Sequence, residues 1–107
     1  KAYQFAIRVV NLYKYLTEEK HEYVMSKGVL EAGTAVGACV KEALQAESRA
    51  DFFHEMYAAL KKASRAEYWL QLLHETGYID ERAYESISAD CLEVVKLLTA
   101  ITKASKR

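Results

Sequence analysis

Residues 48–73 read SRADFFHEMYAALKKASRAEYWLQLL, and this stretch decides the fold. Ser48 is a preferred helix N-cap, and Asp51 stands three residues later as a variant of the capping box. From there apolar side chains recur at alternating steps of four and three for about seven turns, which places them on one face of a helix. The stripe consists of Phe52, Met56, Ala59, Ala63, Ala66, Leu70 and Leu73. The stretch therefore predicts a long amphipathic helix, and Gly77 supplies the left-handed residue that would close it.

Three more helices are predicted around this one. The first covers residues 2–18 and the second about 22–46, while Asp80 caps the last, whose basic end extends over residues 103–107. The first helix carries Phe5, Val9, Leu12 and Leu16 on one face, and the last carries Ala83, Ile87, Cys91, Val94, Leu98 and Ile101. Short turns make successive helices antiparallel, so the chain predicts one all-α domain over residues 1–107, an antiparallel up-and-down four-helix bundle.

The second predicted helix is unusual in its small residues. Gly28, Ala32, Ala35 and Cys39 step by four, three and four along one face, and Gly33 and Gly37 lie in the same helix. One interpretation is that small side chains let neighbouring helices approach closely. The other is that they leave a groove or cavity for a ligand or a partner. The sequence leaves both open.

Composition excludes several classes of protein. Fifteen basic and fifteen acidic side chains leave no net charge, so no overall field favours nucleic acid or an anionic membrane. No apolar run approaches the roughly 20 residues that span a bilayer. Cys39 and Cys91 lack metal-type spacing and no secretory signal is recognised, so we expect reduced cysteines, no membrane partner and a cytoplasmic protein.

No catalytic, cofactor or metal constellation is apparent. His54 follows Asp51 by three residues, as in di-iron bundles, but His74 follows Gln71 and the apolar stripes hold no inward glutamates. No glycine-rich phosphate loop and no nucleophile–base pair is recognisable from spacing. We therefore expect neither an enzyme nor a bound cofactor.

Two basic clusters raise the question of RNA binding. They are Lys61, Lys62 and Arg65 in the third helix, and Lys103, Lys106 and Arg107 at the end of the chain. On a neutral background, a solvated or subunit-pairing face is the favoured use. The chain also has eight tyrosines and Trp69, more rings than a core of this size holds, so neighbouring subunits are expected to cover some of them.

Several segments of the chain resemble one bacterial family. The matching segments are residues 3–13 (YQFAIRVVNLY), Gly33-Thr34, Glu42-Ala43, Ala50-Asp51-Phe52, Ala59-Leu60-Lys61 and Glu67-Tyr68-Trp69-Leu70. They are similar to the four-helix-bundle proteins encoded within intervening sequences of bacterial 23S ribosomal RNA genes, over essentially the whole chain. The resemblance implies an antiparallel four-helix bundle, assembly as a homopentamer and no enzyme activity. It also implies a ribosomal or RNA-associated role, which rests on gene location.

The chain departs from that family pattern at clustered positions. The family usually has glutamine, arginine, serine, serine and asparagine at positions 28, 31, 32, 35 and 39. It tends to have lysine at position 55 and glutamate at positions 62 and 65. Relative to the family, two positive positions of this chain are therefore negative and two negative positions are positive, so the net charge is unchanged. We interpret this as an engineered variant with a redesigned interface, the alternative being a divergent natural member. The predicted interface comprises Gly28, Glu31, Ala32, Ala35, Cys39, Glu55, Tyr57, Lys62 and Arg65.

The leading functional hypothesis is thus a non-enzymatic, self-assembling helical scaffold whose partner is itself or a designed chain. An RNA- or ribosome-associated binding protein is the main alternative. A bundle that binds a small molecule or a metal through its small-residue stripe is the third.

Overall fold

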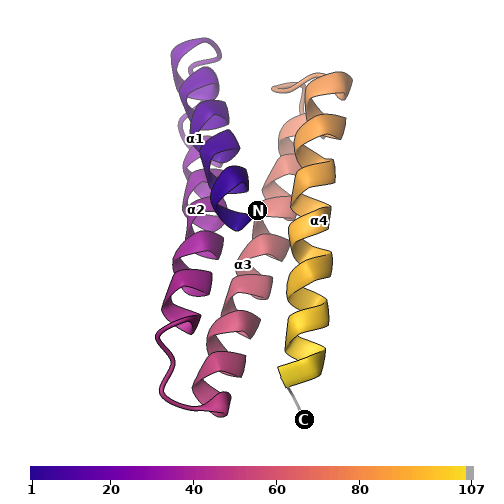
Figure 1. Cartoon of the computed structure of the whole chain (residues 1–107). Helices are drawn as coiled ribbons and strands as arrows, with labels where there is room; N and C mark the ends of the chain where they lie inside the picture. The colour runs from indigo at the N-terminus through magenta and orange to yellow at the C-terminus, as the bar shows by residue number, and fades with distance from the viewer. Residues whose placement is uncertain (106–107) are drawn as a thin grey trace.

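The protein is a bundle of four helices, seen in a computed structural model that describes residues 1–105 (Figure 1). The helices are α1 (Ala2–Glu18), α2 (Met25–Ala43), α3 (Arg49–Glu75) and α4 (Glu81–Ser105). Each packs chiefly against the next along the chain, and α1 closes the bundle through a weaker contact with α4. The predicted all-α up-and-down bundle is confirmed. Lys106 and Arg107, the end of the expected basic tail, lie outside the described residues.

The first helix covers only part of the bundle. Its N-terminus lies about halfway along the other helices in Figure 1, where the Lys1 ammonium pairs with the Glu93 carboxylate of α4. One end of the molecule is therefore built from four helices, and the other from α2, α3 and α4 alone.

The predicted ends of α3 are confirmed. The Ser48 hydroxyl accepts a hydrogen bond from the Asp51 amide at 3.0 Å. At the other end Gly77 has a φ of 85°, and the Tyr78 amide donates to the Leu73 carbonyl at 2.9 Å. This is a Schellman motif, and it turns the chain into α4, where the Ala83 amide donates to the Asp80 carboxylate at 2.8 Å.

The start of α2 differs from the prediction of residue 22. Glu22 is not helical: its carboxylate accepts hydrogen bonds from the amides of Val24, Met25 and Ser26 at 3.0, 2.9 and 2.7 Å. The Ser26 hydroxyl donates to the Glu22 carbonyl in return, at 2.8 Å. This reciprocal cap satisfies the free amides of the first turn, so the helix begins at Met25. At its other end α2 stops at Ala43 rather than at the predicted Ala46.

The core follows the predicted stripes of α1 and α3 closely. Phe5, Val9 and Leu16 of α1 are buried, and Leu12 packs partly buried against them. The prediction for α4 was partly wrong, because Ala83 is exposed and Thr102, rather than Ile101, is buried near its end. In α2 the buried face consists of Ser26, Val29, Ala32, Gly33, Val36 and Ala43. Of the small-residue stripe only Ala32 belongs to this face, whereas Gly28, Ala35 and Cys39 are half-buried beside it.

Truncation of the α3 stripe should be costly. Leu70 and Leu73 are 1% and 0% exposed, so Leu70→Ala or Leu73→Ala should lower the free energy of unfolding by about 2–5 kcal/mol, measured by urea denaturation. Gln71→Ala is the control, since this exposed position should change stability by less than about 0.5 kcal/mol. A leucine variant as stable as the control would contradict the packing of α3.

The Glu22 cap should make stability depend on pH. Burial, the largest single contribution, raises the pKa of this carboxyl, but the hydrogen bonds from Met25, Ser26 and Val24 together bring the pKa below its ordinary value. A lowered folded-state pKa means that the ionised carboxylate stabilises the fold above the unfolded pKa of about 4.3 and loses this effect as pH falls through the folded value.

Glu22→Gln should therefore cost about 1 kcal/mol at neutral pH and progressively less in acid, measured by denaturation at a series of pH values. Glu19→Gln, in the same turn, is the exposed control. A Glu22→Gln deficit that is independent of pH would show that the carboxylate charge plays no part in the cap.

Candidate site between α2 and α3

A small pocket lies between α2 and α3, and the residues singled out in the sequence line it. Gly28, Glu31 and Ala32 contribute from α2, and Lys62, Arg65 and Trp69 from α3. Its volume is about 150 Å³. Five of the nine predicted interface residues thus meet at one place within a single chain.

Gly28 allows the indole of Trp69 to lie directly against α2. A Cβ atom built at position 28 would stand 2.5 Å from Cε2 of Trp69, far inside van der Waals contact. Gly33 plays the same part toward α1, since a Cβ there would stand 2.7 Å from a methyl group of Val9. The close approach predicted for the small residues is therefore present at Gly28 and Gly33, and a small pocket remains beside Gly28.

The charges at the pocket are of opposite sign on the two helices. Glu31 projects from α2, whereas Lys62 and Arg65 come from α3. Within residues 1–105 no ion pair of 4.0 Å or less joins these three side chains to each other or to another charged group. The pocket therefore carries two cations and one carboxylate, a net positive charge.

Cys39 lies further along α2 and does not line the pocket. Burial, followed by the carboxylates of Glu55 and Glu42, raises the pKa of the Cys39 thiol, and the Lys62 ammonium opposes this shift. These groups therefore share one electrostatic environment. Ala35, between Ala32 and Cys39 on this face, is half-buried.

Tyr57 is the predicted residue that the structure places elsewhere on α3. Its ring is 48% exposed and stacks on Phe53 at 5.9 Å, with the Lys61 ammonium 5.8 Å from the ring centroid. Trp69, in contrast, was not part of the predicted set. Its position in the sequence could have placed it in that set, because residues 62, 65 and 69 are three and four residues apart and so share one helical face.

Nucleophilic and metal chemistry find no support in the part of the chain that the structure describes. Burial, with a smaller contribution from Glu67, raises the pKa of Cys91 to about 12, and its thiol lies 3.5 Å from the Ala63 carbonyl. Both cysteines are therefore protonated at neutral pH, unlike reactive thiols. Among residues 1–105 no cluster of three metal-binding side chains occurs, and no helix there has the length and apolarity to cross a membrane.

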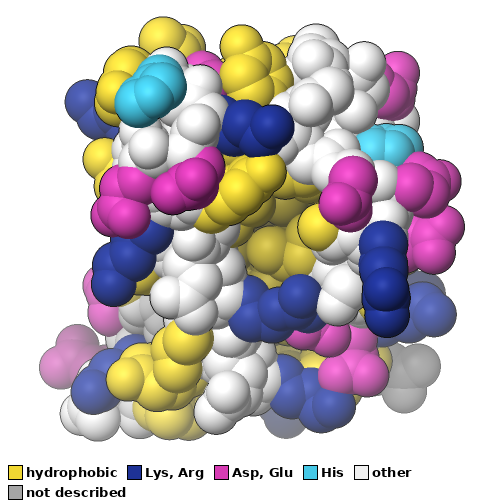
Figure 2. Space-filling model, turned by 90° about the horizontal axis from the view of Figure 1, so that it is seen from above, with side chains coloured by type: hydrophobic (Ala, Val, Ile, Leu, Met, Phe, Trp, Pro, Cys, Tyr) yellow, Lys and Arg dark blue, Asp and Glu magenta, His cyan; other side chains and the backbone are white. Residues whose placement is uncertain are grey.

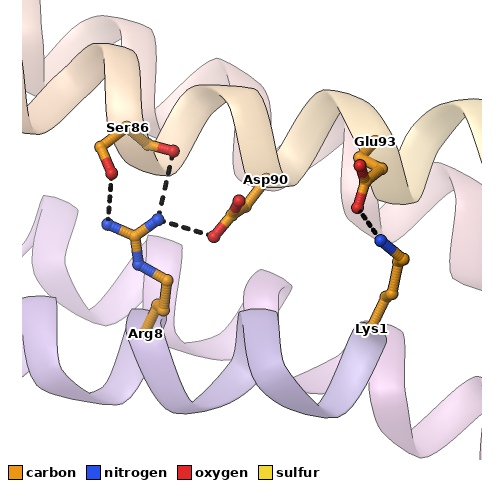
Figure 3. Close-up of polar contacts among 5 residues, drawn as sticks. All are labelled: Lys1, Arg8, Ser86, Asp90 and Glu93. Carbon is orange, nitrogen blue, oxygen red and sulfur yellow. Dashed lines mark hydrogen bonds and ion pairs between the residues drawn. The ribbon is translucent and has the colours of Figure 1, made fainter.

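A second, larger hollow separates α1 from α4. It has a volume of about 430 Å³. Figure 2, which looks down on the upper end of the bundle in Figure 1, shows hydrophobic side chains within a depression. Its lining comprises Arg8, Asn11, Leu12, Tyr15, Ile79, Asp80, Ala83 and Ile87. Arg8 bridges the two helices: it donates to Asp90 at 2.6 Å and to the hydroxyl and carbonyl of Ser86 at 2.9 and 3.1 Å (Figure 3).

Comparison with known proteins agrees with this architecture. Residues 1–100 match the family model described as 23S rRNA-intervening sequence protein. The chain is also similar to the crystal structure of a protein of unknown function from the S23 ribosomal protein family of Bacteroides thetaiotaomicron. The two chains are 52% identical with a TM-score of 0.94, over 95% of this chain and 94% of the other. A comparison with curated proteins gives no match.

The fold is thus that of the small helical proteins associated with ribosomal RNA intervening sequences. The chain belongs to the 23S rRNA-intervening sequence protein family. These findings give no support to the expectation of an engineered variant. Glu31, Lys62 and Arg65, which the sequence assigned to a contact between subunits, line one pocket within a single chain.

Alanine substitutions at two glycines of α2 should have opposite effects. Gly28→Ala drives a methyl group into Trp69, so it should lower the free energy of unfolding by about 1–3 kcal/mol and shift the tryptophan emission to the red as the indole moves toward water. Gly37 is the matched control. A Cβ there would lie 3.8 Å from the Ala2 carbonyl oxygen, an ordinary van der Waals contact, so Gly37→Ala should stabilise the helix by about 0.5–1 kcal/mol. Equal effects at both positions would contradict the close fit at Trp69.

Proposed function

We propose that the protein is a non-enzymatic, self-assembling helical scaffold that forms a ring of identical subunits. The resemblance to the family favours a ring of five. The observation that carries this proposal is the large amount of apolar and aromatic side chain left exposed on two helices, α1 and α3. The protonated, reduced state of Cys39 and Cys91 agrees with a cytoplasmic setting for this assembly.

The first exposed stripe runs along α1. Tyr3 is 74% exposed, and Ile7 and Tyr15 are 42% and 41% exposed. With Asn11 between them, these residues recur every four positions and so share one face. Large apolar patches of this kind on a soluble domain mark surfaces that bind other proteins.

The second stripe runs along α3. It contains Tyr57 and Tyr68, which are 48% and 60% exposed, and the half-buried Phe53 beside Tyr57. A hollow of about 250 Å³ adjoins it, lined by Tyr68, Gln71, Leu72 and Glu75. Tyrosines that combine an apolar ring with a hydroxyl are enriched at protein interfaces.

The positions of the two stripes favour a ring. α1 and α3 both pack against α2 but not against each other, so they occupy diagonal corners of the bundle. Their outer faces therefore point in opposite directions. A contact between α1 of one subunit and α3 of the next is heterologous, and heterologous contacts close into rings when the rotation permits.

RNA binding is the alternative function, and one contact favours it. Lys61 lies over the ring of Tyr57, which stacks on Phe53, so a cation and exposed rings that could stack on bases occur together on α3. Retention of ribosomal RNA that weakens as salt rises would favour this alternative, particularly if Tyr57→Ser abolished it.

Native mass spectrometry should show an assembly of several chains, with five times the 12.2 kDa mass of one chain as the expected value. Ile7→Glu on α1 and Tyr68→Glu on α3 should each yield monomers, because each places a charge in the contact. Tyr23→Glu is the control, since Tyr23 is 61% exposed but belongs to neither stripe. A wild-type monomer at micromolar concentration would overturn the proposal.

Mixing the two variants tests the heterologous arrangement. The Ile7→Glu chain keeps an intact α3 stripe and the Tyr68→Glu chain keeps an intact α1 stripe, so an equal mixture should form dimers of one chain each. If instead each stripe paired with the same stripe of a second chain, the intact stripe of a variant would form homodimers and the mixture would gain no dimers of one chain each, which would contradict the proposed ring.

A further inference from the structure

We infer that the pocket between α2 and α3 binds a small carboxylate with a flat apolar body, that is, a free aromatic monocarboxylate. This inference goes beyond assembly, because it assigns a ligand to a site inside one subunit. It rests on the charges and the shape of the pocket, each of which restricts the chemistry of the occupant.

The cations determine the polar end of the ligand. Lys62 and Arg65 line the pocket without an ion-pair partner within 4.0 Å among residues 1–105. The guanidinium of arginine matches the two oxygens of a carboxylate, and an ammonium beside it adds a second charge-assisted hydrogen bond. Glu31 leaves the pocket a net charge of one, which suits a monoanion and opposes a dianion such as phosphate.

Trp69 and Ala32 determine the apolar end. The pocket volume is about 150 Å³, which is the size of a cavity that accepts a benzene ring, and Trp69 and Ala32 supply its apolar wall. The indole of Trp69 offers a flat surface on which an aromatic ring can stack. Gly28 fixes that indole against α2, so the surface is already formed in the absence of ligand.

The hollow between α1 and α4 does not have this chemistry, although it is larger. Its cation, Arg8, already donates to Asp90 and Ser86 through both terminal nitrogens. An incoming carboxylate would have to displace these partners and with them part of the contact between α1 and α4. Of the cations that line these two pockets, Lys62 and Arg65 of the smaller one have no ion-pair partner among residues 1–105.

Benzoate and benzamide form the probe pair for the test, since they differ mainly in charge. Trp69 is the one tryptophan of the chain, so its fluorescence reports directly on the pocket. Benzoate should change the emission in a saturable manner with a dissociation constant in the millimolar range, and benzamide should bind at least about tenfold more weakly. Inorganic phosphate should not compete.

Variants of the pocket distinguish specific binding from non-specific quenching. Arg65→Gln and Lys62→Gln should each weaken benzoate binding about tenfold, and Glu31→Gln should strengthen it, because it removes the opposing charge. Lys61→Gln is the control: this lysine adjoins Lys62 in sequence but lies over Tyr57, and binding should be unchanged. Equal responses to benzoate and benzamide, or an Arg65→Gln protein that binds like the wild type, would overturn the inference, whatever the subunit number.

Discussion

The close approach of α2 to its neighbours is the constraint on which the rest of the structure depends. Two glycines make it possible, since position 28 accepts the indole of Trp69 and position 33 accepts the side chain of Val9. Each glycine costs the helix roughly 1 kcal/mol relative to alanine, so α2 is intrinsically a weaker helix than α3. Packing on both sides offsets this cost. α2 is therefore the central element that connects α1 to α3, and the bundle is held together mainly by contacts between helices adjacent in the chain.

The opposite side of the bundle is held in a different way. Between α1 and α4 a hollow remains, and the helices are bridged by Arg8 with Asp90 and by Lys1 with Glu93 (Figure 3). These pairs are largely exposed, and exposed ion pairs contribute little to stability. The bundle is thus tight around α2 and loose between its first and last helices. This asymmetry explains why the small, pre-formed pocket lies beside α2 while the larger hollow lies at the loosely closed side.

Much of this could be predicted from the sequence, and the failures have physical causes. The boundaries of α1, the cap at Ser48 and the turn at Gly77 were readable because each depends on local chemistry. The start of α2 was misplaced because the Glu22 carboxylate caps amides that a sequence pattern assigns to the helix. The buried face of α2 was misjudged because glycine and alanine are tolerated both in a core and beside it. The sequence grouped Glu31 with Lys62 and Arg65. It did not show that they line one pocket within a subunit, because that depends on which helices pack together.

The pocket gives the charges at positions 31, 62 and 65 a different interpretation from the one the sequence suggested. From the sequence alone, the four exchanged charges suggested a contact between subunits, because complementary charges select binding partners. In the folded chain three of these four charges, Glu31, Lys62 and Arg65, line one pocket without a second subunit, whereas the Glu55 carboxylate acts on the Cys39 thiol. Because the side chains at the rim are partly exposed, their signs can change at little cost to the fold. Opposite charges on α2 and α3 are therefore accommodated within one subunit at this pocket, and their presence in the sequence does not by itself mark a contact between subunits.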